Sequence, residues 1–506
     1  MTIITPDWVK DAIFYQIFPD RFAKSGRVPK QGLNLESWDS PPTVFGFKGG
    51  DLRGVQDNLD YLLDLGVTAI YFNPIFASAS NHRYHTYDYY SIDPLLGGKA
   101  AFRELLETAH GRGLRVILDG VFNHASRGFW QFHHVLENGA GSPYVDWFHF
   151  NSDFLMGRKN WGAYPSGSQE RLLKNGTNSY DALGYAAWWS LPALPKFNTD
   201  SPAVREFLWN VAVDWLKFGI DGWRLDVAAD IDDDSFWQEF RRRVKNANSE
   251  AYIVAEIWHE AQRWLKGDQF DAVMNYLLTG ALLGFLLKDT IDPEVYRIGD
   301  YGKYLRPLDG PGFADRIDQI MSLYDPAINQ VQLNLLDSHD TPRFLSTAHG
   351  DEGALRLGWL FILTYPGAPC IYYGDEIGMT GQADPDCRKA FPWEPSKWNL
   401  ELQQYLKSLI SIRRAHPALR RGTFHRLAAV ENAYAYGRQL GDDSLVIAMN
   451  ASTDNVVINI PIQSLGWRDG LLSALSGDAR DIPVLIEGQI KELRLAPRSG
   501  VILTRA

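Results

Sequence analysis

The stretch RVILDGVFNH, residues 115–124, sets the pattern from which the fold can be predicted. Its short apolar run ends in Asp119, and further polar side chains follow within a few residues. Unbroken apolar runs of this length are typical of parallel strands that are covered on both faces. The stretch therefore predicts a buried strand whose carboxyl end carries polar side chains.

Seven other runs of this kind occur, at residues 12–19, 69–74, 222–227, 252–258, 272–276, 332–338 and 369–374. Helical periodicity between them predicts helices over 52–65, 99–112, 202–218 and 401–416, the third with Ser201 as N-cap and Pro202 as its first residue. Eight strands alternating with helices predict an α/β fold, a (β/α)₈ TIM barrel. A doubly wound open sheet is the alternative. Polar residues at the ends of several different strands favour the barrel, which builds its active site there.

Two segments interrupt this alternation. The segment after the third strand is too long for an ordinary βα loop, so we predict an inserted subdomain at 125–198. Later, short alternating runs at 433–438, 444–450, 456–460 and 500–504, separated by turn residues, predict a C-terminal antiparallel β-sandwich over 419–506. The predicted catalytic barrel then comprises residues 1–124 and 199–418.

Composition excludes several classes of protein. The 506 residues are 45% hydrophobic and 22% charged, as in ordinary folded proteins. A net charge of −11 argues against nucleic-acid and anionic-membrane partners, which need basic surfaces. Two cysteines exclude a disulfide scaffold and suit a reducing compartment. Residues 1–16 lack a signal-peptide pattern and no apolar run is long enough to span a membrane, so we expect a cytoplasmic protein.

Acidic residues end or follow several of the predicted strands, namely Asp119, Asp226, Glu256 and, beside His339, Asp340. Taken singly, each could cap the helix that follows it. Four carboxyl groups at one barrel mouth would repel one another, and burying them is costly unless they are paired. Their joint occurrence therefore predicts an active site.

Two of these acids have different surroundings in the sequence. Arg224 lies two residues before Asp226, hence on the same side of the strand, and can hold it ionised. Glu256 is followed by Ile257 and Trp258, an apolar setting that favours a protonated carboxyl. Cleavage of a glycosidic bond needs one ionised and one protonated carboxyl group. We predict Asp226 as the nucleophile and Glu256 as the general acid and then base.

Eight motifs, in order along the chain, resemble those of glycoside hydrolase family thirteen, the α-amylase family. They are FYQIFPDRF (14–22), GGDLRGV (49–55), DGVFNH (119–124), LPKFN (194–198), GWRLDVAAD (222–230), EIWH (256–259), LLDSHD (335–340) and IYYGDEIGM (371–379). The resemblance implies a barrel with an insertion after its third strand and a C-terminal β-domain. It also implies cleavage of α-glucans with retention, through a covalent glycosyl-enzyme.

The resemblance also implies roles for individual residues. Asp226 matches the nucleophile, Glu256 the acid/base, and Asp340 a third catalytic acid that grips sugar hydroxyls. The candidate substrate-binding residues are Tyr84, His124, Arg224, His339, Trp258, Asp384 and Arg388. Among them, Tyr84 matches a tyrosine that stacks on the reacting ring. Asp384 and Arg388 resemble residues that bind glucose units further into the minus side of the substrate site.

Within the family, residues 256–276 and 384–389 resemble the cyclomaltodextrinase, neopullulanase and maltogenic amylase group. Those enzymes are usually intracellular dimers with an extra N-terminal β-domain. This chain opens on the first predicted strand, so we expect that domain to be lacking and leave a homodimer, built through other surfaces, open. Asp230 lies in a pair that is usually Asn-Glu, and Asp337 replaces a Gly.

We predict no cofactor and no metal. Residues 23–30, AKSGRVPK, lack the Asn and Asp oxygens with which some relatives bind calcium, and hard cations need several oxygen ligands. Asn123 matches a calcium ligand of other amylases, but hydrogen bonding within its loop is the favoured interpretation.

The sequence thus predicts a retaining hydrolase that cleaves α-1,4 and also α-1,6 glucosidic bonds of maltooligosaccharides, cyclodextrins, pullulan or branched maltodextrins. Two alternatives stay open. A glucan-remodelling transglycosylase would use the same residues but pass the sugar to an acceptor other than water. A catalytically inactive maltodextrin-binding relative would have no need of mutually repelling acids.

Overall fold

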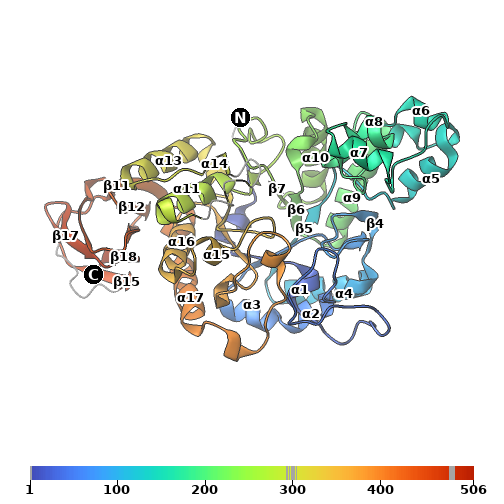
Figure 1. The fold of residues 1–506 in the computed structure, drawn as a ribbon. Helices are drawn as coiled ribbons and strands as arrows, with labels where there is room; N and C mark the ends of the chain where they lie inside the picture. The colour runs from blue at the N-terminus through green and yellow to red at the C-terminus, as the bar shows by residue number, and fades with distance from the viewer. Residues whose placement is uncertain (1–2, 292–294, 296, 298–301, 304, 478–484) are drawn as a thin grey trace.

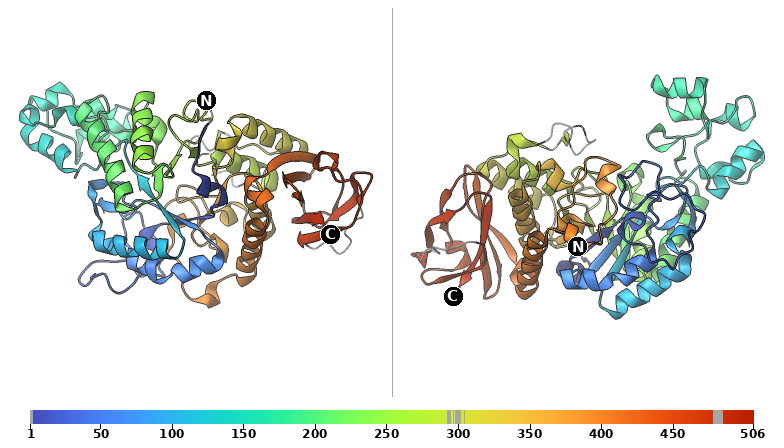
Figure 2. Two further views of the ribbon diagram at one scale, coloured as in Figure 1. Left: turned by 180° about the vertical axis from the view of Figure 1, so that it is seen from behind. Right: turned by 60° about the horizontal axis from the view of Figure 1, so that its bottom comes forward.

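The computed structural model describes residues 3–291, 295, 297, 302–303, 305–477 and 485–506. Figure 1 shows a central barrel with a helical segment, α5–α8, at one end and a β-rich unit at the opposite end. Figure 2 shows the same arrangement from two further directions.

Eight parallel strands form the barrel: β1 (Phe14–Ile17), β2 (Ala69–Phe72), β5 (Arg115–Gly120), β6 (Gly222–Leu225), β7 (Tyr252–Ala255), β8 (Ala272–Val273), β9 (Leu333–Leu335) and β10 (Ala368–Tyr372). They are hydrogen-bonded in the order β8-β7-β6-β5-β2-β1-β10-β9, and a parallel bridge between Met274 and Leu333 joins the two ends. The strands are almost entirely buried, as expected for parallel strands covered by helices. The predicted TIM barrel is confirmed, and the closing bridge excludes the open sheet.

The helices of the barrel are α1 (Pro19–Phe22), α2 (Leu52–Asp57), α3 (Leu59–Leu65), α4 (Gly98–Gly111), α9 (Pro202–Phe218), α10 (Asp234–Ala247), α11 (Tyr276–Leu286), α13 (Gly310–Ser322), α14 (Pro326–Asn329), α15 (Phe344–Thr347), α16 (Glu352–Thr364), α17 (Leu400–Ala415) and α18 (Pro417–Arg421). The four predicted helices are present, the first of them split at Asn58. Pro202 begins α9 as predicted, but the Ser201 side chain makes no capping hydrogen bond. Residues 256–271, between β7 and β8, contain turns and bends.

A long segment separates β5 from α9 and carries α5 (Trp130–Asn138), α6 (Ser152–Leu155), α7 (Ser168–Lys174) and α8 (Ser179–Leu183). Aromatic rings form its core, with Phe132 packed edge-on against Phe148 and Tyr185. An antiparallel bridge between His124 and Lys196 ties its return to the end of β5. A hairpin of β3 (Phe76–Ser78) and β4 (Thr86–Ile92) follows β2. The subdomain boundaries at 125 and 198 stay a prediction.

The C-terminal unit is built from two antiparallel sheets. The larger contains β11 (Thr423–Val430), β12 (Ala433–Leu440), β13 (Asp443–Asn450), β18 (Ser499–Arg505) and β15 (Leu472–Ser476), and the smaller contains β14 (Val456–Pro461), β17 (Gln489–Leu495) and β16 (Leu485–Ile486). Strand β12 is buried on both faces. Ala433 and Ala435 join the core between the sheets, while Tyr434 and Tyr436 alternate with them and join the barrel core. The predicted β-sandwich is therefore present and packs on the barrel.

Within the described ranges, no helix combines the length and apolar character that a bilayer crossing requires.

Candidate active site

Four acidic side chains meet at the carboxyl ends of the barrel strands. Asp119 is the penultimate residue of β5, Asp226 follows β6, Glu256 follows β7, and Asp340 lies in the loop after β9. Because β5, β6 and β7 are neighbours in the sheet, the first three acids stand side by side. These three residues are only 1%, 8% and 5% exposed, so their charges need partners inside the protein.

Arg224, which is fully buried on β6, is the shared partner. Its Nη1 lies 2.9 Å from Asp119 Oδ1 and 3.0 Å from Asp226 Oδ1. Its Nη2 forms an ion pair with Glu256 Oε1 at 3.1 Å. The predicted contact between Arg224 and Asp226 is thus present. Asp226 and Glu256 face the same guanidinium group, which places them together at the barrel mouth.

Glu256 is surrounded by donors. The Val227 amide donates to Oε2 at 2.9 Å, and the Trp258 indole donates to Oε1 at 3.0 Å, next to the Arg224 ion pair. The expected apolar setting of Glu256 is therefore wrong, because Trp258 turns its N–H toward the carboxyl while its ring stacks on Tyr276 at a centroid distance of 3.8 Å. Val227 has φ 39° and ψ 46°, a left-handed conformation that is rare for a β-branched residue and that accompanies the alignment of its amide with Glu256.

A second chain of hydrogen bonds runs from Asp119 to His339. The Tyr84 hydroxyl donates to Asp119 Oδ2 at 2.8 Å and lies 2.7 Å from His339 Nε2. His339 Nδ1 faces the amide nitrogens of Gln16 and Asn73, at 2.9 and 3.1 Å. Because Nδ1 accepts from amide donors, the imidazole proton lies on Nε2 and points to Tyr84.

Asp340 continues the network toward Arg388. Its carboxyl group lies 3.1 Å from His339 Nε2 and 3.3 Å from Arg388 Nη2. Arg388 Nη1 in turn pairs with Asp384 at 3.0 Å, and its Nε donates to the His339 carbonyl at 2.8 Å. Contacts therefore join the candidate residues from Trp258 to Asp384 into one continuous network of five carboxyl groups on two guanidinium groups.

His124 lies outside this network. Its ring stacks on Trp188 at a centroid distance of 5.1 Å, and Trp188 stacks on Trp189 at 4.6 Å. Trp189 is 76% exposed, so the stack runs from a buried histidine to the surface. The Trp188 indole donates to Asp230 Oδ2 at 2.6 Å. Asp230, which stands in place of one residue of the usual Asn-Glu pair, thus fixes the position of Trp188 in this stack.

Burial sets the protonation of the site. It raises the pKa of Asp226 well above its ordinary value; neighbouring carboxylates add to this and Arg224 opposes it. Burial also raises the pKa of Asp340 to about 7. It lowers the pKa of His124 to about 3 and that of His339 well below its ordinary value, so both rings are neutral. Arg224 lowers the Asp226 pKa, as expected, but burial and the neighbouring carboxylates act against it, and the cation is shared among three acids.

Several residues of the network were not among the predicted ones. Gln16 and Asn73 orient His339, and the Tyr71 hydroxyl donates to Asp119 Oδ2 at 2.9 Å. Gln16 and Asn73 are polar residues within, or directly after, otherwise apolar strands. That departure from the apolar pattern is the sequence signal that identifies them.

In the loop at residues 23–30, the Lys30 ammonium group occupies a position between oxygen atoms of Gly49 and Asp51. Lys30 Nζ donates to the Gly49 carbonyl and to Asp51 Oδ2, both at 2.6 Å. Asn123 Nδ2 lies 3.3 Å from the neighbouring His124 Nδ1. Among the described residues, no group of three His, Cys, Asp or Glu side chains has the geometry to hold a metal ion. The absence of a metal stays a prediction, and the position of Lys30 supports it.

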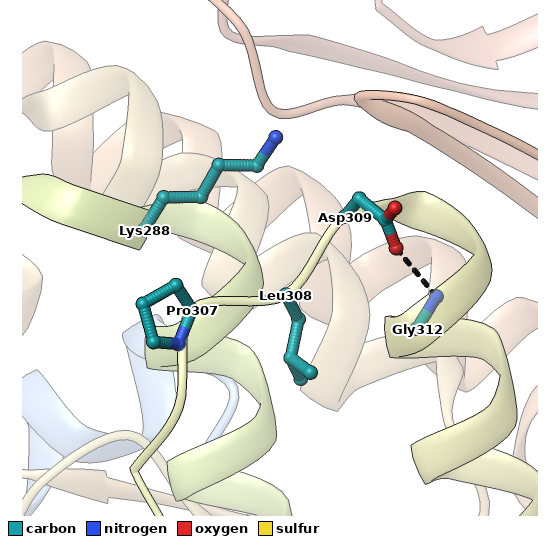
Figure 3. A pocket seen from close by; sticks show the side chains of 5 residues that line it. All are labelled: Lys288, Pro307, Leu308, Asp309 and Gly312. Atoms are coloured by element: carbon teal, nitrogen blue, oxygen red, sulfur yellow. Dashed lines mark hydrogen bonds between the residues drawn. The ribbon is translucent and has the colours of Figure 1, made fainter.

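A surface depression of about 390 Å³ lies beside the start of α13, lined by Lys288, Pro307, Leu308, Asp309 and Gly312 (Figure 3). Asp309 accepts from the Gly312 amide at 2.7 Å and so caps α13. The depression shares no residue with the acid network.

Comparison with known proteins identifies the family. The model of the alpha amylase catalytic domain matches residues 16–421. The chain belongs to the alpha-amylase family. It is a glycoside hydrolase of the group that contains the cyclomaltodextrinases and neopullulanases.

Individual relatives agree with this placement. The chain is 44% identical over 473 residues to a cyclomaltodextrinase of Geobacillus thermopakistaniensis, a match that covers 92% of this chain and 74% of the relative. It is 41% identical to neopullulanase 2 of Thermoactinomyces vulgaris, covering 99% of this chain and 78% of the relative. The crystal structure of a debranching enzyme from Nostoc punctiforme superimposes with a TM-score of 0.87 at 47% identity, over 99% of this chain and all of that one.

Proposed function

We propose that the protein is a retaining α-glucan hydrolase that cleaves α-1,4 and also α-1,6 glucosidic bonds of maltooligosaccharides, cyclodextrins, pullulan or branched maltodextrins. The observation that carries the proposal is the pair of acids, Asp226 and Glu256, held on one buried arginine at the mouth of the barrel. The names of the relatives, a cyclomaltodextrinase, a neopullulanase and a debranching enzyme, support this range of substrates.

In the proposed mechanism, the Asp226 carboxylate attacks the anomeric carbon and forms a glycosyl ester while Glu256 gives its proton to the leaving oxygen. Glu256 then takes a proton from water, which hydrolyses the ester. Arg224 stabilises the negative charge of Asp226 before attack and after release. Asp340, fixed between His339 and Arg388, grips hydroxyl groups of the reacting ring.

The two alternatives differ from the proposal in what they require of this network. A transglycosylase would use the same covalent step and differ only in the acceptor. An inactive maltodextrin-binding relative would not need five carboxyl groups gathered around two cations, because such a cluster is costly to bury without a task. A cytoplasmic location is part of the proposal and is supported by Cys370 and Cys387, which are both free and buried. A homodimer stays open.

The test is product analysis on γ-cyclodextrin, pullulan and a branched maltooligosaccharide, with wild type and Asp226→Asn side by side. We expect wild type to release shorter sugars with retained anomeric configuration, and Asp226→Asn to lose about 10⁴-fold or more of the turnover. Asp232→Asn is the matched control, an exposed acid in the loop after β6. Products longer than the substrate would favour the transglycosylase, and undiminished turnover of Asp226→Asn would refute the assignment of the nucleophile.

A further inference from the structure

The loop between α1 and α2 carries an exposed aromatic ring, Phe45, and buried side chains hydrogen-bond to the backbone on both sides of it. Phe45 is 89% exposed, although a phenyl ring in water forgoes about 1.5–3 kcal/mol of burial free energy. Buried Asn81 donates through Nδ2 to the carbonyl groups of the two residues that flank Phe45, at 3.0 Å to Val44 and 2.8 Å to Gly46. The ring is thus displayed by a fixed peptide segment.

The same segment is connected to the sugar-binding end of the acid network. The buried Arg21 guanidinium donates through Nη2 to the Gly46 carbonyl at 2.7 Å and through Nη1 to the Arg388 carbonyl at 3.2 Å. The Arg21 side chain therefore bridges the backbone of Gly46, the residue after Phe45, and the backbone of Arg388. Asn81, the other clamp, lies three residues before Tyr84, whose hydroxyl group binds Asp119.

Through Arg21, the segment that carries Phe45 and the backbone of Arg388 are bonded to one guanidinium group, so this segment lies close to Arg388. A glucan chain that extends past Arg388 toward this segment would come within reach of the exposed ring. The apolar C–H faces of glucose stack on aromatic rings, and a rigidly held ring pays less ordering entropy when a sugar binds. We propose that Phe45 is a stacking platform for a glucosyl unit of long maltodextrins, on the Arg388 side of the bond that is cleaved. The inference rests on the proposed function, and it implies that this loop makes the enzyme favour long maltodextrins over short ones.

The test compares maltoheptaose with maltotriose for wild type, Phe45→Ala and Phe45→Trp, with Leu471→Ala as a control. Leu471 is 68% exposed and directly precedes β15 of the C-terminal unit. Losing one stacking contact should weaken the binding of the long sugar by a few-fold. We therefore expect Phe45→Ala to lower kcat/KM on maltoheptaose about 3- to 10-fold and on maltotriose less than 2-fold. Phe45→Trp should retain the wild-type ratio, and Asn81→Ala should reproduce the Phe45→Ala ratio.

Equal losses on both substrates, or no loss on either, would overturn the inference. A change of oligomeric state in Phe45→Ala without a chain-length effect would also overturn it, and would make the ring a protein contact. Binding of both sugars to the Glu256→Gln variant, measured by calorimetry, checks that the effect lies in affinity. If wild type cleaves neither sugar, the proposed function itself fails, which is a different outcome from cleavage of both sugars with an unchanged ratio.

Discussion

Replacing Arg224 by Met would test whether one cation holds the acid network together. Methionine fills similar space, so the main loss is the charge that Asp119, Asp226 and Glu256 share. We expect the variant to fold, to be less stable than wild type, and to be almost inactive.

The magnitude follows from the contact distances. At an effective dielectric constant of about 20, unit charges about 4 Å apart attract by about 4 kcal/mol. Removing one partner of a buried ion pair costs about 3–5 kcal/mol. The loss does not triple with three acids, because the carboxyl groups repel one another and take up protons instead. At about 2.1 cal/mol/K per residue, unfolding 506 residues corresponds to about 1 kcal/mol per degree, so Tm should fall by about 3–5 °C.

The dependence on pH distinguishes lost charge from lost packing. Without the guanidinium, which lowers the native pKa values of Asp119 and Asp226, both values rise. An acid with a raised native pKa contributes stability at low pH that is lost as the pH rises through that pKa. The deficit in Tm should therefore be small near pH 4.5 and largest near pH 8, as measured by calorimetry. Arg413→Met is the control, because Arg413 is buried and donates to backbone carbonyls such as those of Leu363 and Gly367. Its deficit should stay constant between these pH values, and a constant deficit in Arg224→Met would refute the reasoning.

Three further predictions follow from the site. Because burial raises the pKa of Asp226 and the nucleophile must be ionised, kcat/KM should fall on the acidic side at a pH well above 3.8, the ordinary value of an aspartate; a limb at or below pH 4 would contradict this. Burial raises the pKa values of both Asp337 and Asp375, which face each other beside Arg343. Because Asp337→Asn removes one of the two repelling charges, its Tm should fall by about 1–3 °C less than that of wild type between pH 5 and pH 8.5. Parallel plots of Tm against pH for the two proteins would contradict this. Dialysis against EDTA should leave Tm and activity unchanged, since Lys30 occupies the oxygen-rich position, and stoichiometric calcium in a metal analysis would disprove this.

The sequence predicts the fold well where the signal is local. Each barrel strand is a short apolar run, and each predicted helix has its own apolar periodicity, so both could be recognised without knowledge of their neighbours. Residues 52–65 show the limit of this approach, because the single helix predicted there is split at Asn58. Ser201 shows another limit, since the residue type and position are right for a cap but the side chain does not form the bond.

The candidate site could be predicted in its residues but not in its electrostatics. Asp226 and Glu256 were identifiable because acids rarely end buried strands. Their environments depend on partners that are distant in sequence. Asp119 shares the guanidinium of Arg224, and the Val227 amide reaches Glu256 from the loop after the neighbouring strand β6. No reading of residues next to Glu256 could supply these contacts.

Val227 limits what can be engineered at this mouth. Its left-handed backbone sits between the nucleophile and the Ala229-Asp230 pair that faces the tryptophan stack. A library that randomises this stretch to change acceptor preference should keep position 227 native or restrict it to Gly or Asn, which tolerate such torsion angles. A variant with Pro there would lose the backbone N–H that donates to Glu256, and it would fail for a reason unrelated to sugar recognition.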